Sequence, residues 1–229
     1  MPQMILDFIS RSYFVIIYGI ALIASIKTYR KYFDTVFKYL PVIIAYTFCN
    51  ELLGYMIKYF PDYTFFNDLK DSQYNEIIYN LYDLVFFPYF YYAYWKLSSN
   101  KINRNRILWA SIIAMSSYII SCFFQNPMDI TLFYAYTIAS VALLYCIFIN
   151  FKEKYNAKAK IINRYNLVFW INSSLIIFYS TSPFLLIIGY TQYEMWEFYN
   201  LRLVLNILIV VMYSVLTIGF LSNSKRSFK

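Results

Sequence analysis

The sequence contains no histidine. This absence excludes a histidine general base, a histidine-ligated haem and a histidine zinc site. Only four glycines are present, none of them in a phosphate-binding loop, and no G-x-S-x-G nucleophile elbow occurs. No lysine lies in the middle of the last apolar segment, which argues against a retinal Schiff base. We therefore expect no resident metal and no cofactor, and a chain that is not an enzyme.

Cysteine is scarce as well. The three cysteines, Cys49, Cys122 and Cys146, all lie within apolar segments, and no two of them have C-x-x-C spacing. A free cysteine in such a setting is typically a small buried apolar residue. The cysteines therefore predict packing rather than metal binding.

Charged residues make up 14% of the 229 residues and hydrophobic residues 61%. Soluble domains carry roughly a quarter charged residues and about half apolar ones. A bilayer-spanning helix needs about 20 mostly apolar residues. Runs such as VLNILIVVMYSVLTIGF do not alternate as the strands of a membrane β-barrel would. Since lipid requires every backbone polar group to be paired internally, these runs predict transmembrane helices.

Seven such segments predict an all-α, polytopic membrane protein with a single domain over residues 1–229. The predicted spans are about 12–28, 36–57, 77–95, 107–125, 130–151, 166–190 and 201–222. No A-x-A cleavage site follows the first segment, so we expect it to be a retained helix rather than a signal peptide. The Lys- and Ala-rich residues 152–165 are expected to extend the fifth helix.

The net charge of +8 is unevenly distributed between the loops. Basic residues follow the first, third, fifth and seventh segments, whereas the intervening loops are acidic. Cytoplasmic loops of membrane proteins are enriched in lysine and arginine. Seven spans place all four basic stretches on one side, which predicts an outside N-terminus and a cytoplasmic C-terminus in the inner membrane. The basic residues are thereby explained by topology, and we expect no nucleic-acid partner.

Two carboxylates fall inside predicted spans, Glu51 in the second and Asp83 in the third. Ionisable groups at such positions usually face the bundle interior or a cavity. Both lie at similar depth, roughly 9–10 Å from the outer boundary at 1.5 Å per residue. Asn80 is three residues before Asp83 and shares its face, so we expect it to help satisfy that carboxylate. Tyrosine hydroxyls and Arg202 are further expected partners.

Together with neighbouring polar residues, these acids predict an outward-facing cavity for a small-molecule ligand. The candidate lining residues are Glu51, Asn80, Asp83, Asn172, Ser173, Arg202 and Asn206. Pro183 is expected to kink the sixth span beside them. The alternative is that these groups serve only as hydrogen-bonding contacts between helices, without a ligand. Glu51 and Asp83 could also form a catalytic pair of carboxylates, but nothing else in the sequence supports that role.

Four short motifs carry a resemblance that covers nearly the whole chain. They are Asn50-Glu51-Leu52, Tyr79-Asn80, Phe169-Trp170-Ile171 and Ile177-Phe178. With these motifs the chain resembles a group of small, uncharacterised seven-helix proteins of the bacterial inner membrane. Members are often encoded beside sensor kinases, so the resemblance implies a sensory or accessory role. The chain differs in having Asn172 and Ser173, rather than glycine, after Phe-Trp-Ile.

Three functions are compatible with this pattern. The first is a receptor-like or accessory signalling module, with a cytoplasmic partner at its basic loops. The second is a small permease of three-plus-one-plus-three helices, suggested by Tyr-Asn-Leu at positions 79, 165 and 199. The third is a membrane-perturbing, pore-type effector, although no span carries a stripe of hydrated residues.

Overall fold

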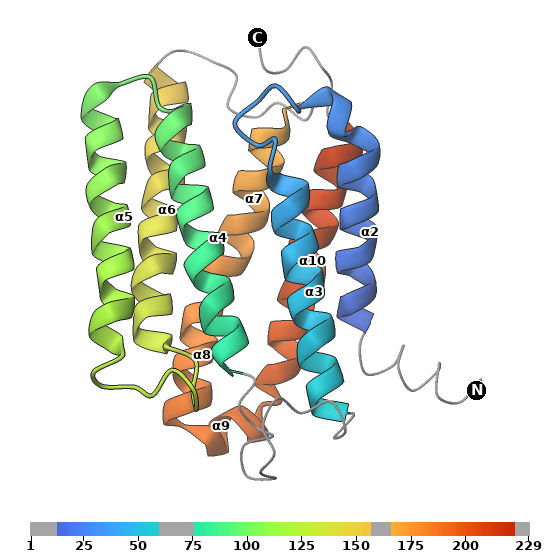
Figure 1. Cartoon of the computed structure of the whole chain (residues 1–229), viewed down its shortest axis with the longest axis vertical. Helices are drawn as coiled ribbons and strands as arrows, with labels where there is room; N and C mark the ends of the chain where they lie inside the picture. Colours follow the sequence, from blue (N-terminus) through green and yellow to red (C-terminus); the bar gives the residue numbers. More distant parts are fainter. Residues whose placement is uncertain (1–12, 60–75, 157–165, 223–229) are drawn as a thin grey trace, which may run out of the picture.

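The computed structural model describes residues 13–59, 76–156 and 166–222. Over these residues the chain folds into helices and contains no β-strand (Figure 1). The predicted all-α class is therefore confirmed. The elements are α2 (Tyr13–Thr28), a 3-10 helix (Tyr29–Lys31), α3 (Leu40–Tyr59), α4 (Glu76–Leu97), α5 (Lys101–Ser121), α6 (Phe133–Asn156), α7 (Leu167–Tyr179), α8 (Ser182–Thr191), α9 (Tyr193–Phe198) and α10 (Leu201–Ser222).

Helix α5 begins six residues before the predicted span, because Asn100 caps it. The Asn100 side chain accepts a hydrogen bond from the Ile102 backbone N–H at 2.9 Å, as is common at helix N-termini. The predicted extension of the fifth span is seen as far as Asn156, and residues 157–165 lie outside the described part of the chain.

The predicted span 166–190 consists of two helices, α7 and α8, rather than one continuous helix. The interruption falls at Ser180 and Thr181, directly before Pro183 in the first turn of α8. Proline lacks a backbone N–H and its ring clashes with the preceding turn, so it is favoured at the start of a helix and not within one. The break thus lies where the sequence predicts a kink.

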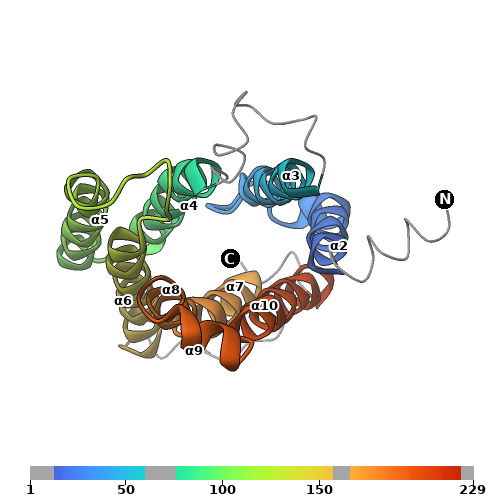
Figure 2. The ribbon, with the colours of Figure 1, turned by 90° about the horizontal axis from the view of Figure 1, so that it is seen from below.

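Viewed along the bundle, the helices surround a common interior (Figure 2). Helix α2 contacts α3, α3 contacts α4, and α4 contacts α6. Helix α6 contacts α7 and α8, which both contact α10, and α10 packs back on α2. Helix α5 lies outside this ring, against α4 and α6. Residues from these seven helices can therefore meet in the interior.

Four segments of the described chain are long and apolar enough to cross a membrane. They are Leu40–Ile57, Phe133–Asn156, Leu167–Thr191 and Leu201–Ser222. Helix α5 carries Lys101, Arg104 and Arg106 in its first two turns, which lowers its apolar character. Membrane association is thus supported, whereas the count of seven spans stays a prediction.

The outer faces of the helices are apolar and the interior holds polar groups. On α5, Ile113 and Ile119 are 61% and 67% exposed, whereas Ser117 is buried. Soluble proteins seldom expose large contiguous apolar surfaces. This distribution is that expected of helices surrounded by lipid.

The two ends of the bundle differ in charge. The turn between α2 and α3 and the turn between α4 and α5 lie at one end, together with the C-terminal end of α6 (Figure 1). This basic end carries Lys27, Arg30, Lys31, Lys38, Lys96, Lys101, Arg104, Arg106, Lys152 and Lys154. The opposite, acidic end carries Glu76, Asp129, Glu194 and Glu197, together with the basic residues Lys58 and Arg202.

Candidate functional site

A cavity of about 450 Å³ lies between the helices on the side of the acidic end. Side chains from α2, α3, α4, α6, α7, α8, α9 and α10 line it. Along α10 the lining runs from Arg202 to Tyr213, which is about 16 Å at 1.5 Å per residue. Small-molecule pockets typically occupy about 300–1,000 Å³. The cavity therefore has the size of a ligand site and extends halfway through the bundle.

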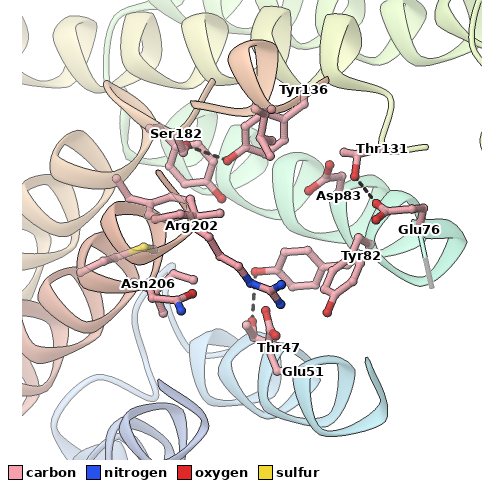
Figure 3. A pocket seen from close by; sticks show the side chains of 18 of the residues that line it. Thr47, Glu51, Glu76, Tyr82, Asp83, Thr131, Tyr136, Ser182, Arg202 and Asn206 are labelled. Carbon is pink, nitrogen blue, oxygen red and sulfur yellow. Dashed lines mark hydrogen bonds between the residues drawn. The ribbon is translucent and has the colours of Figure 1, made fainter. Parts of the chain in front are cut away.

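Four of the seven predicted site residues line this cavity, as Figure 3 shows. They are Glu51 of α3, Asp83 of α4, and Arg202 and Asn206 of α10. No ion pair joins Arg202 to either carboxyl group in the structure as described. The two acids therefore share a cavity with the guanidinium without being neutralised by direct contact with it.

Asn80 has a structural role that differs from the predicted one. Its amide N–H groups donate to the carbonyls of Pro127 and Ile130, at 2.8 and 3.0 Å. Its Oδ1 accepts a hydrogen bond from the Leu132 backbone N–H at 2.9 Å. With these bonds Asn80 holds the connection between α5 and α6, and both of its N–H groups are used. The prediction that it satisfies Asp83 is wrong.

Asn172 and Ser173 also lie away from the cavity. Asn172 is fully buried towards the basic end, where its Oδ1 accepts from the Tyr94 hydroxyl at 2.6 Å. Its amide donates to Asn150 Oδ1 at 3.3 Å. The Ser173 hydroxyl donates to the Phe169 carbonyl one turn earlier, at 2.9 Å. Asn172 thus connects helices, as in the alternative interpretation of interhelical contacts, whereas the Ser173 hydrogen bond stays within α7.

Glu51 is bordered by two tyrosines. The Tyr18 hydroxyl of α2 donates to Glu51 Oε1 at 3.4 Å, and Tyr79 of α4 also contacts this carboxyl group. Tyr79 crosses α3 at Gly54, where an added methyl group would lie 2.5 Å from the tyrosine oxygen. The glycine thus leaves room for Tyr79 to reach Glu51, a relation that the sequence does not show.

Asp83 lies deeper, in an aromatic environment. It is 5% exposed, and Tyr82, Tyr136 and Tyr179 line the cavity with it. The Tyr118 hydroxyl of α5 faces the carboxyl group, but the two do not reach hydrogen-bond geometry. Within the described part of the chain, no other side chain donates a hydrogen bond to Asp83.

A third carboxyl group, that of Glu76, stands at the mouth of the cavity. It accepts a hydrogen bond from the Thr131 hydroxyl, and the Tyr190 hydroxyl of α8 donates to Thr131 Oγ1 at 3.1 Å. Glu76 lies just before the predicted third span, 77–95, and is not among the lining residues predicted from the sequence. Its position in the first turn of α4 is a signal that could have identified it, because acidic residues favour helix N-termini.

The interruption between α7 and α8 contributes to the wall of the cavity. The Ser182 and Tyr136 hydroxyls lie 2.8 Å apart and connect α8 to α6. On α3, the Thr47 and Tyr82 hydroxyls lie 3.0 Å apart and connect that helix to α4. The wall is thus formed by hydroxyl pairs between neighbouring helices.

Aromatic rings close the cavity towards the basic end. Tyr179 lies 5.6 Å from Phe86 and 5.5 Å from Phe87 between ring centroids, and Phe86 lies 4.7 Å from Phe90. Such edge and tilted arrangements are favourable for buried rings. The cavity consequently ends inside the bundle.

The cavity offers charged, hydrogen-bonding and aromatic groups to a ligand. Carboxyl groups, hydroxyls, aromatic faces and one guanidinium surround the space. In the described ranges, no group of three histidine, cysteine, aspartate or glutamate side chains is placed to hold a metal ion.

Comparison of the chain with known protein families, with curated proteins and with solved structures finds no match.

Proposed function

We propose that this protein is a receptor-like membrane module that binds a small ligand in the cavity. It crosses the bacterial inner membrane seven times, with the acidic end outside and the basic end in the cytoplasm. The observation that carries the proposal is the form of the cavity. It reaches the acidic end beside the exposed Arg202 and ends at the aromatic layer around Tyr179.

The separation of charge between the two ends supports the orientation, because lysine and arginine accumulate on the cytoplasmic side. Lys101 and Arg106 are exposed at the start of α5, where a cytoplasmic partner can reach them. Ligand binding changes the packing of α10, which lines the cavity and also reaches the basic end. The change passes to a signalling protein bound at the basic residues.

Co-purification from native membranes in mild detergent, followed by mass spectrometry, tests this function. We expect a cytoplasmic signalling protein in fixed ratio, and its reduced recovery when Lys101→Gln and Arg106→Gln are combined. Substitution of the acidic-end residue Asp129 by asparagine is the control and leaves recovery unchanged. If the protein is recovered alone from membranes at native expression, the receptor proposal is refuted.

A small permease is the second candidate, and the order of the helices favours it. Two groups follow each other around the ring, α2–α3–α4 and then α6–α7–α8–α10, while α5 lies outside. Three-plus-one-plus-three transporters have this division, with the substrate site between the groups. Uptake of a cavity ligand into proteoliposomes would support the permease, and binding without uptake would support the receptor.

A further inference from the structure

We propose that the ligand of the cavity is a small organic cation, with its ammonium group at Asp83 and its apolar body against the surrounding rings. This inference rests on the proposed binding function and adds the chemical class of the ligand.

The charges that line the cavity are mostly of one sign. Three carboxyl groups, of Glu51, Glu76 and Asp83, face a single guanidinium, that of Arg202. Arg202 stands in the first turn of α10 and is exposed at the mouth. It forms no ion pair with the deeper acids in the part of the chain that the structure describes. In Figure 3 its guanidinium is directed towards Glu51 and Tyr82, and no cationic side chain pairs with Asp83 in the described ranges.

The three carboxyl groups differ in how far the protein satisfies them. Glu76 accepts from Thr131, and Glu51 accepts from Tyr18. Asp83 is only 5% exposed, and in the described ranges it receives no hydrogen bond of good geometry. Its carboxyl group lies at the cavity in Figure 3. A buried polar group without a partner is costly, and a ligand N–H group placed here would satisfy it.

The walls around Asp83 are suited to a cation. The side chains of Tyr82, Tyr136 and Tyr179 border the same space as the carboxyl group. Aromatic faces attract ammonium groups through the ring quadrupole, by about 0.5–2 kcal/mol according to desolvation. A carboxyl group among such rings recognises an amine by charge and the carbon body of the ligand by apolar contact.

The volume of the cavity and its remaining lining side chains limit the size of the ligand. Phe178, Leu186 and Ile209 form an apolar part of the cavity wall. A volume of about 450 Å³ holds an aromatic or branched amine. An inorganic cation would leave this apolar wall without contacts.

Calorimetric titration of the purified full chain with three probes of matched shape tests the proposal. The probes are 2-phenylethylammonium, 2-phenylethanol and 3-phenylpropanoate, which carry positive, no and negative charge. We expect the cation to bind about tenfold or more tightly than the other two, the difference expected of a charge-assisted hydrogen bond. Equal or tighter binding of the alcohol or the carboxylate, or no binding of the cation, would overturn the inference.

The variant Asp83→Asn is expected to reduce the affinity for the cation to that for the alcohol. Asp34→Asn removes the same charge from an exposed turn near the basic end and is expected to leave the affinity unchanged. If Asp83→Asn fails to fold, the charge preference of the unmodified protein still decides whether the cavity binds a cation. A preference for the carboxylate refutes the cation while leaving the receptor proposal intact, since that proposal depends on recovery of a partner.

Discussion

Gly219 of α10 lies so close to Trp170 of α7 that a methyl group on the glycine would overlap the tryptophan Cβ. That Cβ is attached directly to the α7 backbone, so rotation of the side chain cannot relieve the overlap. The contact explains why α7 and α10 pack closely. Small residues commonly permit such close approach between membrane helices.

We therefore expect Gly219→Ala to destabilise the protein by about 1–3 kcal/mol, the usual cost of overpacking. Gly19→Ala is the matched control, because its added methyl group would lie 3.7 Å from Phe48, an ordinary contact. Thermal unfolding in detergent measures both variants. Equal midpoints for the two would show that α7 and α10 adjust without cost.

Asn80→Ala is expected to destabilise the protein by at least about 1–3 kcal/mol, because it leaves buried backbone groups of the α5–α6 connection unpaired. Asn206→Ala is the comparison, since Asn206 lines the cavity and makes no hydrogen bond in the described ranges. Thermal unfolding again reports the difference. A larger effect of Asn206→Ala would show that Asn80 does not hold the connection.

Glu153 of α6 holds the turn between α4 and α5. Its Oε1 accepts from the Ser98 hydroxyl at 2.5 Å and from the Asn103 amide at 2.6 Å. Glu153→Ala is expected to cost about 1.5–3 kcal/mol, because hydrogen bonds to a charged group are lost. It should also increase proteolysis at residues 98–100, whereas Lys152→Ala at an exposed neighbouring site should not. Unchanged proteolysis would contradict this role.

Cys122 provides a test of orientation. It is exposed at the C-terminal end of α5, at the acidic end. Cys146 is buried, and Cys49 is exposed but lies in the middle of α3, away from both ends. If the acidic end is outside, a membrane-impermeant maleimide should label spheroplasts. Labelling should be lost in Cys122→Ser. Labelling that appears only in inverted membrane vesicles would reverse the proposed orientation.

The helical segments were predictable because apolar runs and helix-breaking residues are local properties. The last predicted span, 201–222, has the same bounds as α10. The interruption before Pro183 was predicted from the chemistry of proline. Pro88, by contrast, lies inside α4 without ending it, because neighbouring helices can support a membrane helix around a proline.

The candidate site was predictable in part. The depth of Glu51 and Asp83 along their helices is fixed by sequence spacing, and both line the cavity. The partners of a side chain depend on how helices rotate and pack, which spacing does not determine. Asn80 shares a helical face with Asp83, yet its amide reaches the carbonyls of Pro127 and Ile130 in a distant connection.

The break at Ser180 and Thr181 divides the sixth predicted span into two separate helices. Helix α8, about 15 Å long at its ten residues, borders the cavity, while α7 is fixed towards the basic end through Asn172. Both helices reach the cavity, α7 through Phe178 and Tyr179 at its C-terminal end, so the break lets α8 adjust to a ligand while Asn172 holds the other part of α7. Helix α10 is continuous through both halves, so of these two predicted spans it is the one that connects the cavity to the basic end without a break.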